Sequence, residues 1–437
     1  MAKKKRIIIV GAGLSGLSAA WHLQKRGIEC LVFEKEPEVG GLCRSKKING
    51  FTFDYAGHLL HFRHRYAFNL VKRLLSDNLH PYKRSAWVYS HERYIPYPFQ
   101  ANLFGLPPKV VKDCLMGFIQ AHHNKRFLKK RNMSFHDWIY DTFGKGIAAH
   151  FMVPYNRKFW TVPLTELTCE WLNGFIPLPS LAEVVEGAVQ KTKKDGWGYN
   201  SRFWYPEKGG IASLPLALAR QIRNIYTHCE IVEVNSKEKE IRMKSGSKEK
   251  FDCLISTIPL PEFGCLFKSL PQSIHSLLHK LKWNSIFNLN LGLQKRKNAH
   301  CHWVYFPQKE INFFRIGFPS CFSPYTVPSR GSSLYAEVAY SKDQPIDKSS
   351  IVSSIKKDLQ KIGIIGGEGD VCAQDVNDIR YGYPIYDKNY RGARKGIVRF
   401  LLQKQIIPCG RFGSWRYMSM EDVLLNGMEL AKSIAHY

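Results

Sequence analysis

Three glycines near the start of the chain have the spacing of a site for a nucleotide phosphate. Gly11, Gly13 and Gly16 directly follow an apolar run at 7–10 and open a stretch with helical apolar spacing. Gly11 allows a tight turn, Gly13 lets the backbone approach a pyrophosphate, and Gly16 lets the helix pack on the strand. Glu34 ends the next apolar run, where its carboxylate can accept hydrogen bonds from ribose hydroxyls. The pattern predicts dinucleotide binding; the alternative is a glycine turn in an ordinary α/β domain.

A second group of residues has types that suit a phosphorylated ligand with rings. Aromatic side chains stack on a base or a sugar, and arginine pairs two phosphate oxygens at once. For any single aromatic residue, packing in a core is the alternative interpretation. Aromatic residues and arginines recur together in Gly- and Pro-rich segments at 94–100, 151–160, 197–200, 303–307, 313–315, 381–384 and 410–417.

The elements that must position these residues follow from apolar spacing. Segments 5–10, 29–33 and 251–257 predict buried strands, with a helix at 17–26 between the first two. Segment 405–408 predicts a strand that leads to a glycine and then to a helix. Further strands are predicted at 51–53, 229–234, 240–243, 303–307 and 313–315, and a helix at 420–435. Residues 66–194 are expected to be mostly helical with Pro-rich interruptions, of which 94–100 cannot be helical, and 201–211 looks like the return of the chain into the nucleotide-binding domain.

The composition limits the class of protein. With 437 residues and 44% apolar side chains, the chain is long enough for two or three domains and too apolar for a disordered protein. It has no secretory signal and no apolar run of about 18 residues, the length that a membrane span needs. Its 11 cysteines include no Cys-x-x-Cys pair. This excludes a zinc module, predicts no metal site and favours a cytoplasmic location.

The net charge of +28 predicts attraction to polyanions. The lysine runs at 3–5, 129–131 and 191–194 are short and separated, so a solvated basic surface is the alternative. No specific nucleic acid is expected as a partner. Weak peripheral contact with an anionic membrane is a hypothesis, which salt-sensitive sedimentation with anionic vesicles would test.

The segment after Glu34 resembles a known superfamily of flavoproteins. Gly40, Gly41, Leu42 and Arg44 match the loop that lies along FAD in amine oxidases, phytoene desaturases and UDP-galactopyranose mutases. An NAD dehydrogenase has no need of this loop, so FAD is the predicted cofactor. Over nearly the whole chain, the sequence looks like the eukaryotic-type UDP-galactopyranose mutases. This resemblance rests on 40–42, 57–58, 96–100, 154–156 with Trp160, 303–306, 314–315, 382–384 and the eight-residue segment 410–417.

The resemblance implies an isomerase reaction with no net redox change. Members of this family interconvert UDP-galactopyranose and UDP-galactofuranose through a covalent adduct between N5 of reduced FAD and the sugar. NADPH or another reductant supplies the initial reduction, and Arg84 falls where the family has a basic residue for NADPH. The implied partner is a nucleotide sugar, UDP-galactose or a related compound, and the implied process is cell-surface glycan biosynthesis. The oligomeric state is not predicted.

The resemblance also implies roles for individual residues. It assigns catalysis to His58, Arg315 and Arg411. It assigns FAD contacts to Gly11, Gly13, Gly16, Glu34, Gly40, Gly41, Leu42, Arg44, Gly57, His58, Gly410, Arg411, Tyr417 and Glu421. It assigns substrate contacts to Tyr97, Phe99, Gln100, Asn156, Trp160, Asn200, Trp303, Tyr305, Arg315, Tyr383 and Tyr417.

Three positions depart from the family pattern. Phe175 stands where the family has a pyrophosphate arginine, Phe322 where it has a phosphate tyrosine, and Ala86 where it has a serine near the NADPH position. Losing one charge-assisted bond costs on the order of 1.5–3 kcal/mol. Either another residue replaces the contact, or the substrate is a different nucleotide sugar. Two rivals therefore stay open: an FAD-dependent oxidoreductase of the amine oxidase or desaturase type, and a non-catalytic relative.

The expected fold is α/β. It combines a discontinuous Rossmann-like FAD-binding domain, similar to that of glutathione reductase, with a helical subdomain and a second mixed or antiparallel sheet that forms the substrate site. The expected boundaries are 1–65, 200–260 and 370–437 for the FAD-binding domain, 66–199 for the helical domain and 261–369 for the sheet-containing domain.

Overall fold

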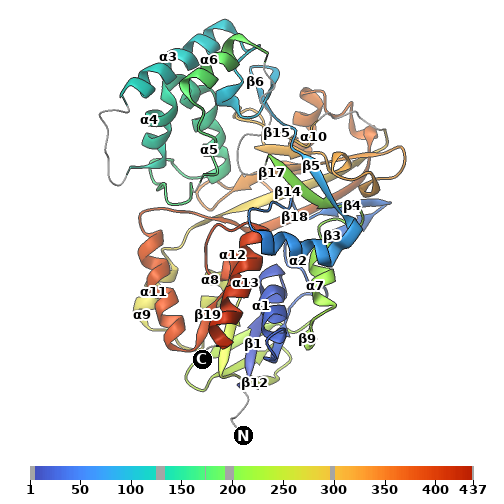
Figure 1. Cartoon of the computed structure of the whole chain (residues 1–437), viewed down its shortest axis with the longest axis vertical. Helices are drawn as coiled ribbons and strands as arrows, with labels where there is room; N and C mark the ends of the chain where they lie inside the picture. Colours follow the sequence, from blue (N-terminus) through green and yellow to red (C-terminus); the bar gives the residue numbers. More distant parts are fainter. Residues whose placement is uncertain (1–4, 125–132, 173, 192–200, 296–300, 436–437) are drawn as a thin grey trace.

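Five parallel strands carry the N-terminal glycine motif in the computed structural model, which describes residues 5–124, 133–172, 174–191, 201–295 and 301–435 (Figure 1). Every strand pair in this sheet is parallel, and β1 is buried along its whole length, as expected for a sheet covered on both faces. This arrangement confirms the predicted α/β class with a Rossmann-like sheet. The strand order is β19 (Ile406–Pro408), β13 (Cys253–Ser256), β1 (Ile7–Val10), β2 (Cys30–Phe33) and β9 (Ile225–Tyr226).

Two helices from opposite ends of the chain pack together against this sheet. They are α1 (Leu14–Gln24) and α13 (Met420–Ala435), which lie side by side in the lower part of Figure 1. A Cβ on Gly427 would lie 2.4 Å from the Ser18 hydroxyl oxygen, so glycine permits their close approach. Ser18 also donates a hydrogen bond to the Leu424 carbonyl at 2.8 Å. The C-terminal helix is thereby held beside the N-terminal glycine motif.

A second sheet of seven strands lies above the first. Its neighbouring strands are antiparallel except for β15 and β6, which are parallel. The strand β14, which lies between β18 and β17, is buried over nearly its whole length. The strand order is β18 (Val371–Pro384), β14 (Trp283–Leu293), β17 (Ser332–Tyr340), β16 (Arg315–Gly317), β15 (Trp303–Tyr305), β6 (Ala86–Ser90) and β7 (Arg93–Pro96).

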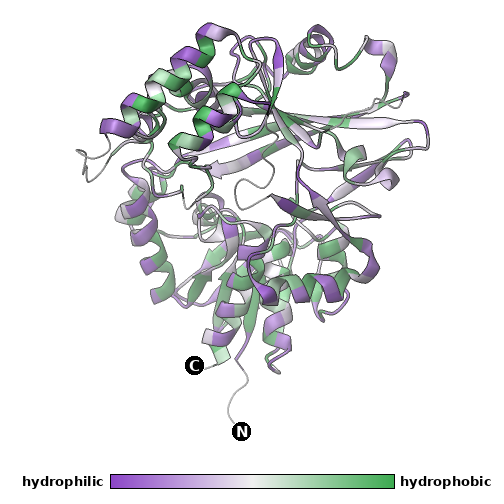
Figure 2. Cartoon of the chain, turned by 45° about the horizontal axis from the view of Figure 1, so that its top comes forward, coloured by the Kyte–Doolittle hydropathy of each residue, from purple (hydrophilic) through white to green (hydrophobic). Residues whose placement is uncertain are grey.

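Four helices form a cap at the other end of the molecule (Figure 1). A Cβ on Gly146 would lie 2.1 Å from the Asp113 carbonyl oxygen, so the first two helices approach each other at glycine. Hydrophobic and hydrophilic residues alternate along these outer helices, so that each buries one side (Figure 2). The helices are α3 (Pro108–Asn124), α4 (Phe135–Ile147), α5 (Val153–Trp160) and α6 (Leu181–Val189), with a π-helix at Ala148–Met152.

The remaining elements connect these parts. Two antiparallel two-stranded sheets pair β3 (Ser45–Ile48) with β4 (Phe51–Asp54) and β5 (Leu79–Lys83) with β8 (Arg202–Pro206). A third sheet joins β10 (Ile231–Asn235), β11 (Glu240–Met243) and β12 (Lys248–Lys250). The other helices are α2 (Arg65–Leu75), α7 (Ser213–Ala219), α8 (Leu260–Gly264), α9 (Gln272–Leu278), α10 (Ile351–Lys361), α11 (Tyr390–Gln403) and α12 (Gly410–Gly413). None of the helices described in the structure is long and apolar enough to cross a membrane. All eleven cysteines are free thiols.

Strand pairing differs from the sequence interpretation at two places. The stretch expected to be mostly helical contains β5 and β6, because residues 86–90 alternate between buried and half-buried positions as a strand does. It also contains β7, which overlaps the segment 94–100 that was expected to be extended. Residues 371–384 were expected in the FAD-binding domain, but β18 pairs with β14 in the seven-stranded sheet, where alternate side chains are buried. The division into three domains otherwise stays a prediction.

Candidate functional site

The glycine motif forms a cradle at the N-terminus of α1. A Cβ on Gly16 would lie 1.9 Å from the Gly11 carbonyl oxygen, so this glycine is needed for the turn itself. Gly13 is not required by the turn in this way, because a Cβ there would come no closer to another heavy atom than 3.8 Å, the distance to the Gly41 Cα. Gly13 is also the N-cap of α1, which has no side-chain cap. The helix N-terminus therefore keeps an uncapped face on which an anion can bind.

Two other predicted segments meet this cradle. Gly40 donates a backbone hydrogen bond to the Ala12 carbonyl at 2.8 Å, which fixes the second glycine pair against the first motif. Gly410 has a φ of +77°, and a Cβ there would lie 1.9 Å from the Ser15 hydroxyl oxygen. The structure thus brings together three glycine segments that are far apart in the sequence.

Three charged residues predicted to contact the cofactor hold protein segments in place. Glu34 accepts hydrogen bonds from the backbone N–H groups of Ala12 at 2.7 Å and Glu36 at 3.0 Å. The Arg44 Nε donates to the Gly41 carbonyl at 2.9 Å. Glu421 is buried and accepts hydrogen bonds from the backbone N–H groups of Arg63 at 2.8 Å and His64 at 2.6 Å. Their direct contact with a cofactor stays a prediction.

A buried ion pair lies where the second sheet faces this cradle. The Arg315 Nε donates to the Glu337 carboxylate at 2.5 Å, and only 2% of Glu337 is exposed. Burial lowers the pKa of the guanidinium, but attraction to Glu337 outweighs burial and the pKa stands well above its usual range. Glu337 also accepts a hydrogen bond from the Gly57 N–H at 3.4 Å. The ion pair therefore links Arg315 to the Gly57-His58 segment.

The Gly57-His58 segment is fixed by close packing. The ring of Tyr335 lies between Gly57 and Gly317, since a Cβ on either glycine would come within 2.3 Å of it. The His58 Nδ1 lies 3.1 Å from the Ala56 carbonyl oxygen, so this nitrogen carries the proton. Burial lowers the pKa of His58 to about 4, and the nearby arginines Arg411 and Arg315 add to this effect. His58 is therefore neutral at physiological pH, with Nε2 as an acceptor.

Four tyrosines from different elements lie close together: Tyr155 on α5, Tyr305 on β15, Tyr383 on β18 and Tyr417 after α12. Tyr155 packs edge-to-face on Tyr305 with ring centroids 5.4 Å apart, and Tyr383 stacks on Tyr417 with centroids 5.8 Å apart. Burial raises the pKa of Tyr417 to about 12, so this hydroxyl is a donor at neutral pH. None of the four hydroxyl groups has a hydrogen-bond partner among the described residues, nor is any of them fully enclosed. They are free to donate to a ligand.

Arg411 lies over this tyrosine pair. Its guanidinium carbon is 4.8 Å from the ring centroids of both Tyr383 and Tyr417. Its two terminal nitrogens donate to the carbonyls of Met418 at 3.0 Å and Gly382 at 3.1 Å. The buried Nε has no partner in the described part of the chain. Arg411 is thus held rigidly with one charged donor left for a ligand.

Several predicted substrate residues lie in the core rather than in this set. Phe99 is fully buried and stacks on Phe151, and the Gln100 amide donates to the Pro177 carbonyl at 2.8 Å. Trp160 and Trp303 are buried, while the Asn156 amide donates to the Met152 carbonyl at 2.7 Å. Asn200 lies outside the described residues. Substrate contact by these residues stays a prediction that their burial does not favour.

The three departures from the family pattern have different surroundings. Phe322 is buried against Phe203 and Tyr205, so it is a core residue. Phe175 packs edge-to-face on Tyr417 at 4.8 Å and so borders the tyrosine set. Ala86 is buried on β6, which lies beside the site strand β15. Of these three residues, only Phe175 borders the tyrosines that are expected to bind the phosphates of a ligand.

Sequence reasoning missed Glu337, and it gave Tyr155 no role of its own although this residue lies in the aromatic segment 151–160 and in the matched motif 154–156. Phe151, Tyr155 and Phe159 are four residues apart and stack along one helical face, with centroids 5.4 and 6.3 Å apart. This aromatic stripe was visible in the sequence. Glu337 had no local signal, because its importance comes from its pairing with a residue on another strand.

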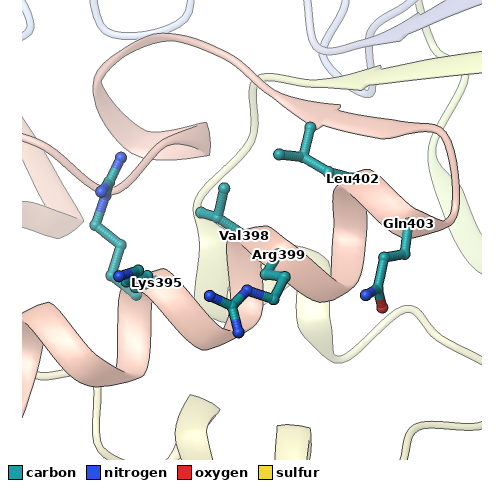
Figure 3. Close-up of a pocket in the computed structure, with 6 residues that line it drawn as sticks. Lys395, Val398, Arg399, Leu402 and Gln403 are labelled. Carbon is teal, nitrogen blue, oxygen red and sulfur yellow. The ribbon is translucent and has the colours of Figure 1, made fainter.

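A basic hollow lies on α11, separate from the tyrosine set (Figure 3). It is open, measures about 530 Å³ and is lined by Arg394, Lys395, Val398, Arg399, Leu402 and Gln403. None of these residues was predicted for the site. The hollow gives the expected contact with an anionic membrane a candidate surface, and that contact stays a prediction.

Comparison with known proteins decides the family. The model of the flavin containing amine oxidoreductase family matches residues 14–397. The chain belongs to this family. As a flavin containing amine oxidoreductase family member it is a flavoenzyme, and the family implies FAD as the cofactor.

Its relatives within this family differ in activity. The chain is 23% identical to protoporphyrinogen oxidase 2, chloroplastic/mitochondrial, from Arabidopsis thaliana, over 90% of this chain and 86% of that protein. It is 27% identical to a crystal structure of reduced UDP-galactopyranose mutase, with a TM-score of 0.94 over 99% of this chain and 94% of that chain. A structure of a putative protoporphyrinogen oxidase from Exiguobacterium has a TM-score of 0.77 at 15% identity, which shows the shared fold alone.

The cradle fits the FAD that the family implies. Gly13 has no side chain to keep a pyrophosphate from the backbone, and the uncapped N-terminus of α1 favours negative charge beside it. The buried Ser256 hydroxyl at the end of β13 has no partner among the described residues, so a ligand atom can satisfy it. The residues that would hold FAD are the glycines of the three segments at 11–16, 40–41 and 410.

Lowering the pH is expected to destabilise the protein through His58. Its folded pKa of about 4 lies below the ordinary 6.5, so the unfolded chain binds more protons between these values. The stability that His58 contributes is therefore complete above pH 6.5 and is lost as the pH falls towards 4. Between pH 7 and pH 5, the free energy of unfolding should fall by about 1–2 kcal/mol more in the wild type than in His58→Asn.

Urea unfolding at the two pH values measures this difference. Burial raises the pKa of Asp54 to about 6, which acts in the opposite direction, but this contribution is common to both proteins. Equal losses in the two proteins would contradict a neutral, buried His58.

Proposed function

We propose that the chain is a nucleotide-sugar mutase that uses reduced FAD to interconvert UDP-galactopyranose and UDP-galactofuranose, or a related pyranose and furanose pair. The observation that carries this proposal is the rigid Arg411 above the stacked Tyr383 and Tyr417, with an Nε donor that has no partner among the described residues and two tyrosine hydroxyls that form no hydrogen bond to them. Such donors suit a pyrophosphate, whereas an oxidase for apolar substrates has no need of them. The likeness to reduced UDP-galactopyranose mutase supports the same function.

The residues of the chain would bind and orient the substrate. The Arg411 Nε and the hydroxyls of Tyr383 and Tyr417 hold phosphate oxygens, which also keeps the nucleotide in place while its bond to the sugar is broken. Arg315, fixed by Glu337, adds a second positive charge close to the tyrosines. The neutral His58 can accept a hydrogen bond from a sugar hydroxyl through Nε2. When bound, reduced FAD supplies the nucleophile for the anomeric carbon of the sugar.

The first test is conversion of UDP-galactopyranose by reduced and oxidised protein. The FAD-loaded protein is reduced anaerobically with dithionite, mixed with UDP-galactopyranose and analysed by chromatography. We expect UDP-galactofuranose with the reduced protein and none with the oxidised protein. The variant Arg380→Met, which removes an exposed arginine from the outer side of β18, should behave as the wild type. Bound, reducible FAD without a furanose product would contradict the substrate assignment.

An oxidase is the second candidate, because protoporphyrinogen oxidase 2 aligns over 90% of the chain. An oxidase consumes oxygen in proportion to product, whereas a mutase does not.

For the mutase, NADPH or another reductant is the proposed electron donor. Arg84 lies at the position that the resemblance implies for NADPH binding, and its guanidinium packs over the Tyr97 ring at 4.9 Å.

A further inference from the structure

One row of residues crosses five strands of the seven-stranded sheet. Asn288 on β14 is opposite Asn377 on β18 and Glu337 on β17. Glu337 is in turn opposite Arg315 on β16, which is opposite Tyr305 on β15. Residues directly opposite each other on neighbouring strands point to the same face of a sheet. The side chain of Asn288 therefore lies on the face that carries Arg315 and Tyr305.

This face of β14 meets the loops that follow the glycine cradle. Ile286, two residues before Asn288, packs in a cluster that includes Leu42 and Ala56. Asn290, two residues after it, donates to the Asp54 carbonyl at 3.0 Å. Asn288 lies between these two contacts and so faces the 54–57 segment, next to His58.

The carboxamide of Asn288 is buried without a partner. Its side chain has no exposed area, and neither Nδ2 nor Oδ1 has a hydrogen-bond partner in the described parts of the chain. Its neighbours in the row are satisfied. Glu337 binds Arg315, and Asn377 donates to Asp375 at 2.8 Å and accepts from Lys46 at 2.8 Å. Leaving a buried amide without hydrogen bonds is unfavourable, so an apolar side chain would suit this position better if nothing bound there.

We propose that Asn288 hydrogen-bonds the isoalloxazine ring of bound flavin, directly or through one fixed water. The edge of this ring carries adjacent N–H, N and C=O groups, and a carboxamide offers both a donor and an acceptor to match them. Reduction turns a ring nitrogen from an acceptor into a donor, and the amide can serve either form. Asn288 thereby contributes to FAD affinity and to the balance between oxidised and reduced flavin. The proposal rests on flavin binding and is independent of the mutase reaction.

The test compares Asn288→Leu with wild-type protein in three measurements: urea unfolding of the FAD-free protein, the Kd for FAD by fluorescence titration, and the flavin reduction potential. We expect unchanged or higher stability of the FAD-free protein, because an unpaired polar group is removed. We also expect an approximately tenfold weaker FAD affinity and a shifted potential and flavin spectrum. Asn288→Ala repeats the test in case leucine does not fit.

Asn290→Leu is the matched control. Its amide is bonded to the protein, at the Asp54 carbonyl and at the Asp375 carboxylate, so this variant should lower stability with and without FAD alike. If both Asn288 variants bind FAD with wild-type affinity, spectrum and potential, Asn288 does not contact the flavin and the proposal is wrong. These measurements need no sugar substrate, so a failed mutase assay does not affect them.

Discussion

Replacing Arg315 by methionine is expected to abolish turnover and to destabilise the fold. Methionine removes the charge while keeping much of the side-chain length. It leaves the Glu337 carboxylate buried, with the Gly57 N–H as its one remaining partner among the described residues. Breaking a buried ion pair in this way costs about 3–5 kcal/mol. We expect a loss of this size in urea unfolding, together with a decrease in kcat/KM of about 100-fold or more.

A double variant separates the two effects. In Arg315→Met with Glu337→Gln, no buried charge is left, so much of the stability should return while turnover stays low. The control for a general loss of positive charge is Arg380→Met, because Arg380 is an exposed arginine on β18. If the double variant regained turnover along with stability, Arg315 would be a structural residue without a role in the reaction.

Replacing Gly13 by alanine is expected to remove FAD binding without unfolding the protein. The backbone at Gly13 has φ −68° and ψ 175°, which alanine adopts easily, and the added Cβ would meet only the Gly41 backbone at 3.8 Å. The FAD-free protein should thus keep its stability or gain about 0.4–1 kcal/mol. The same methyl group occupies the space where the pyrophosphate approaches α1. We expect the Kd for FAD to rise by about 100-fold or more.

Fluorescence titration with FAD and urea unfolding without FAD measure these two expectations. Gly392→Ala is the control, because this exposed glycine on α11 has no atom within 4 Å of its added Cβ. A normal FAD affinity in Gly13→Ala would show that the pyrophosphate does not bind against this glycine.

Local sequence signals predicted the nucleotide-binding half of the molecule well. The glycine spacing after β1, the strand at 253–256 and the helix at 420–435 all follow from patterns within a few residues. These elements are specified by backbone freedom at glycine and by apolar periodicity, which are visible without a partner strand. Arg411 and the tyrosines at 383 and 417 were predicted from the resemblance to the mutase family rather than from these patterns, and the structure brings the three together.

The second sheet could not be predicted to the same depth. Its strands β6, β7 and β18 come from distant segments, and their register depends on partners that the sequence does not name. The row that joins Asn288, Glu337 and Arg315 exists only through this register. Phe322 shows the reverse problem, since a position read by resemblance as a phosphate site is filled by a core side chain.

The most direct test of the mutase proposal counts turnovers for each reducing equivalent. The FAD-loaded protein is reduced anaerobically once, excess dithionite is removed, and UDP-galactopyranose is added in large excess while the flavin spectrum is recorded. A mutase predicts many molecules of UDP-galactofuranose per flavin, with the flavin still reduced at the end and no oxygen required. Product that stops at one equivalent as the flavin is oxidised, or that appears only with oxygen consumption, would contradict the proposal and favour an oxidase.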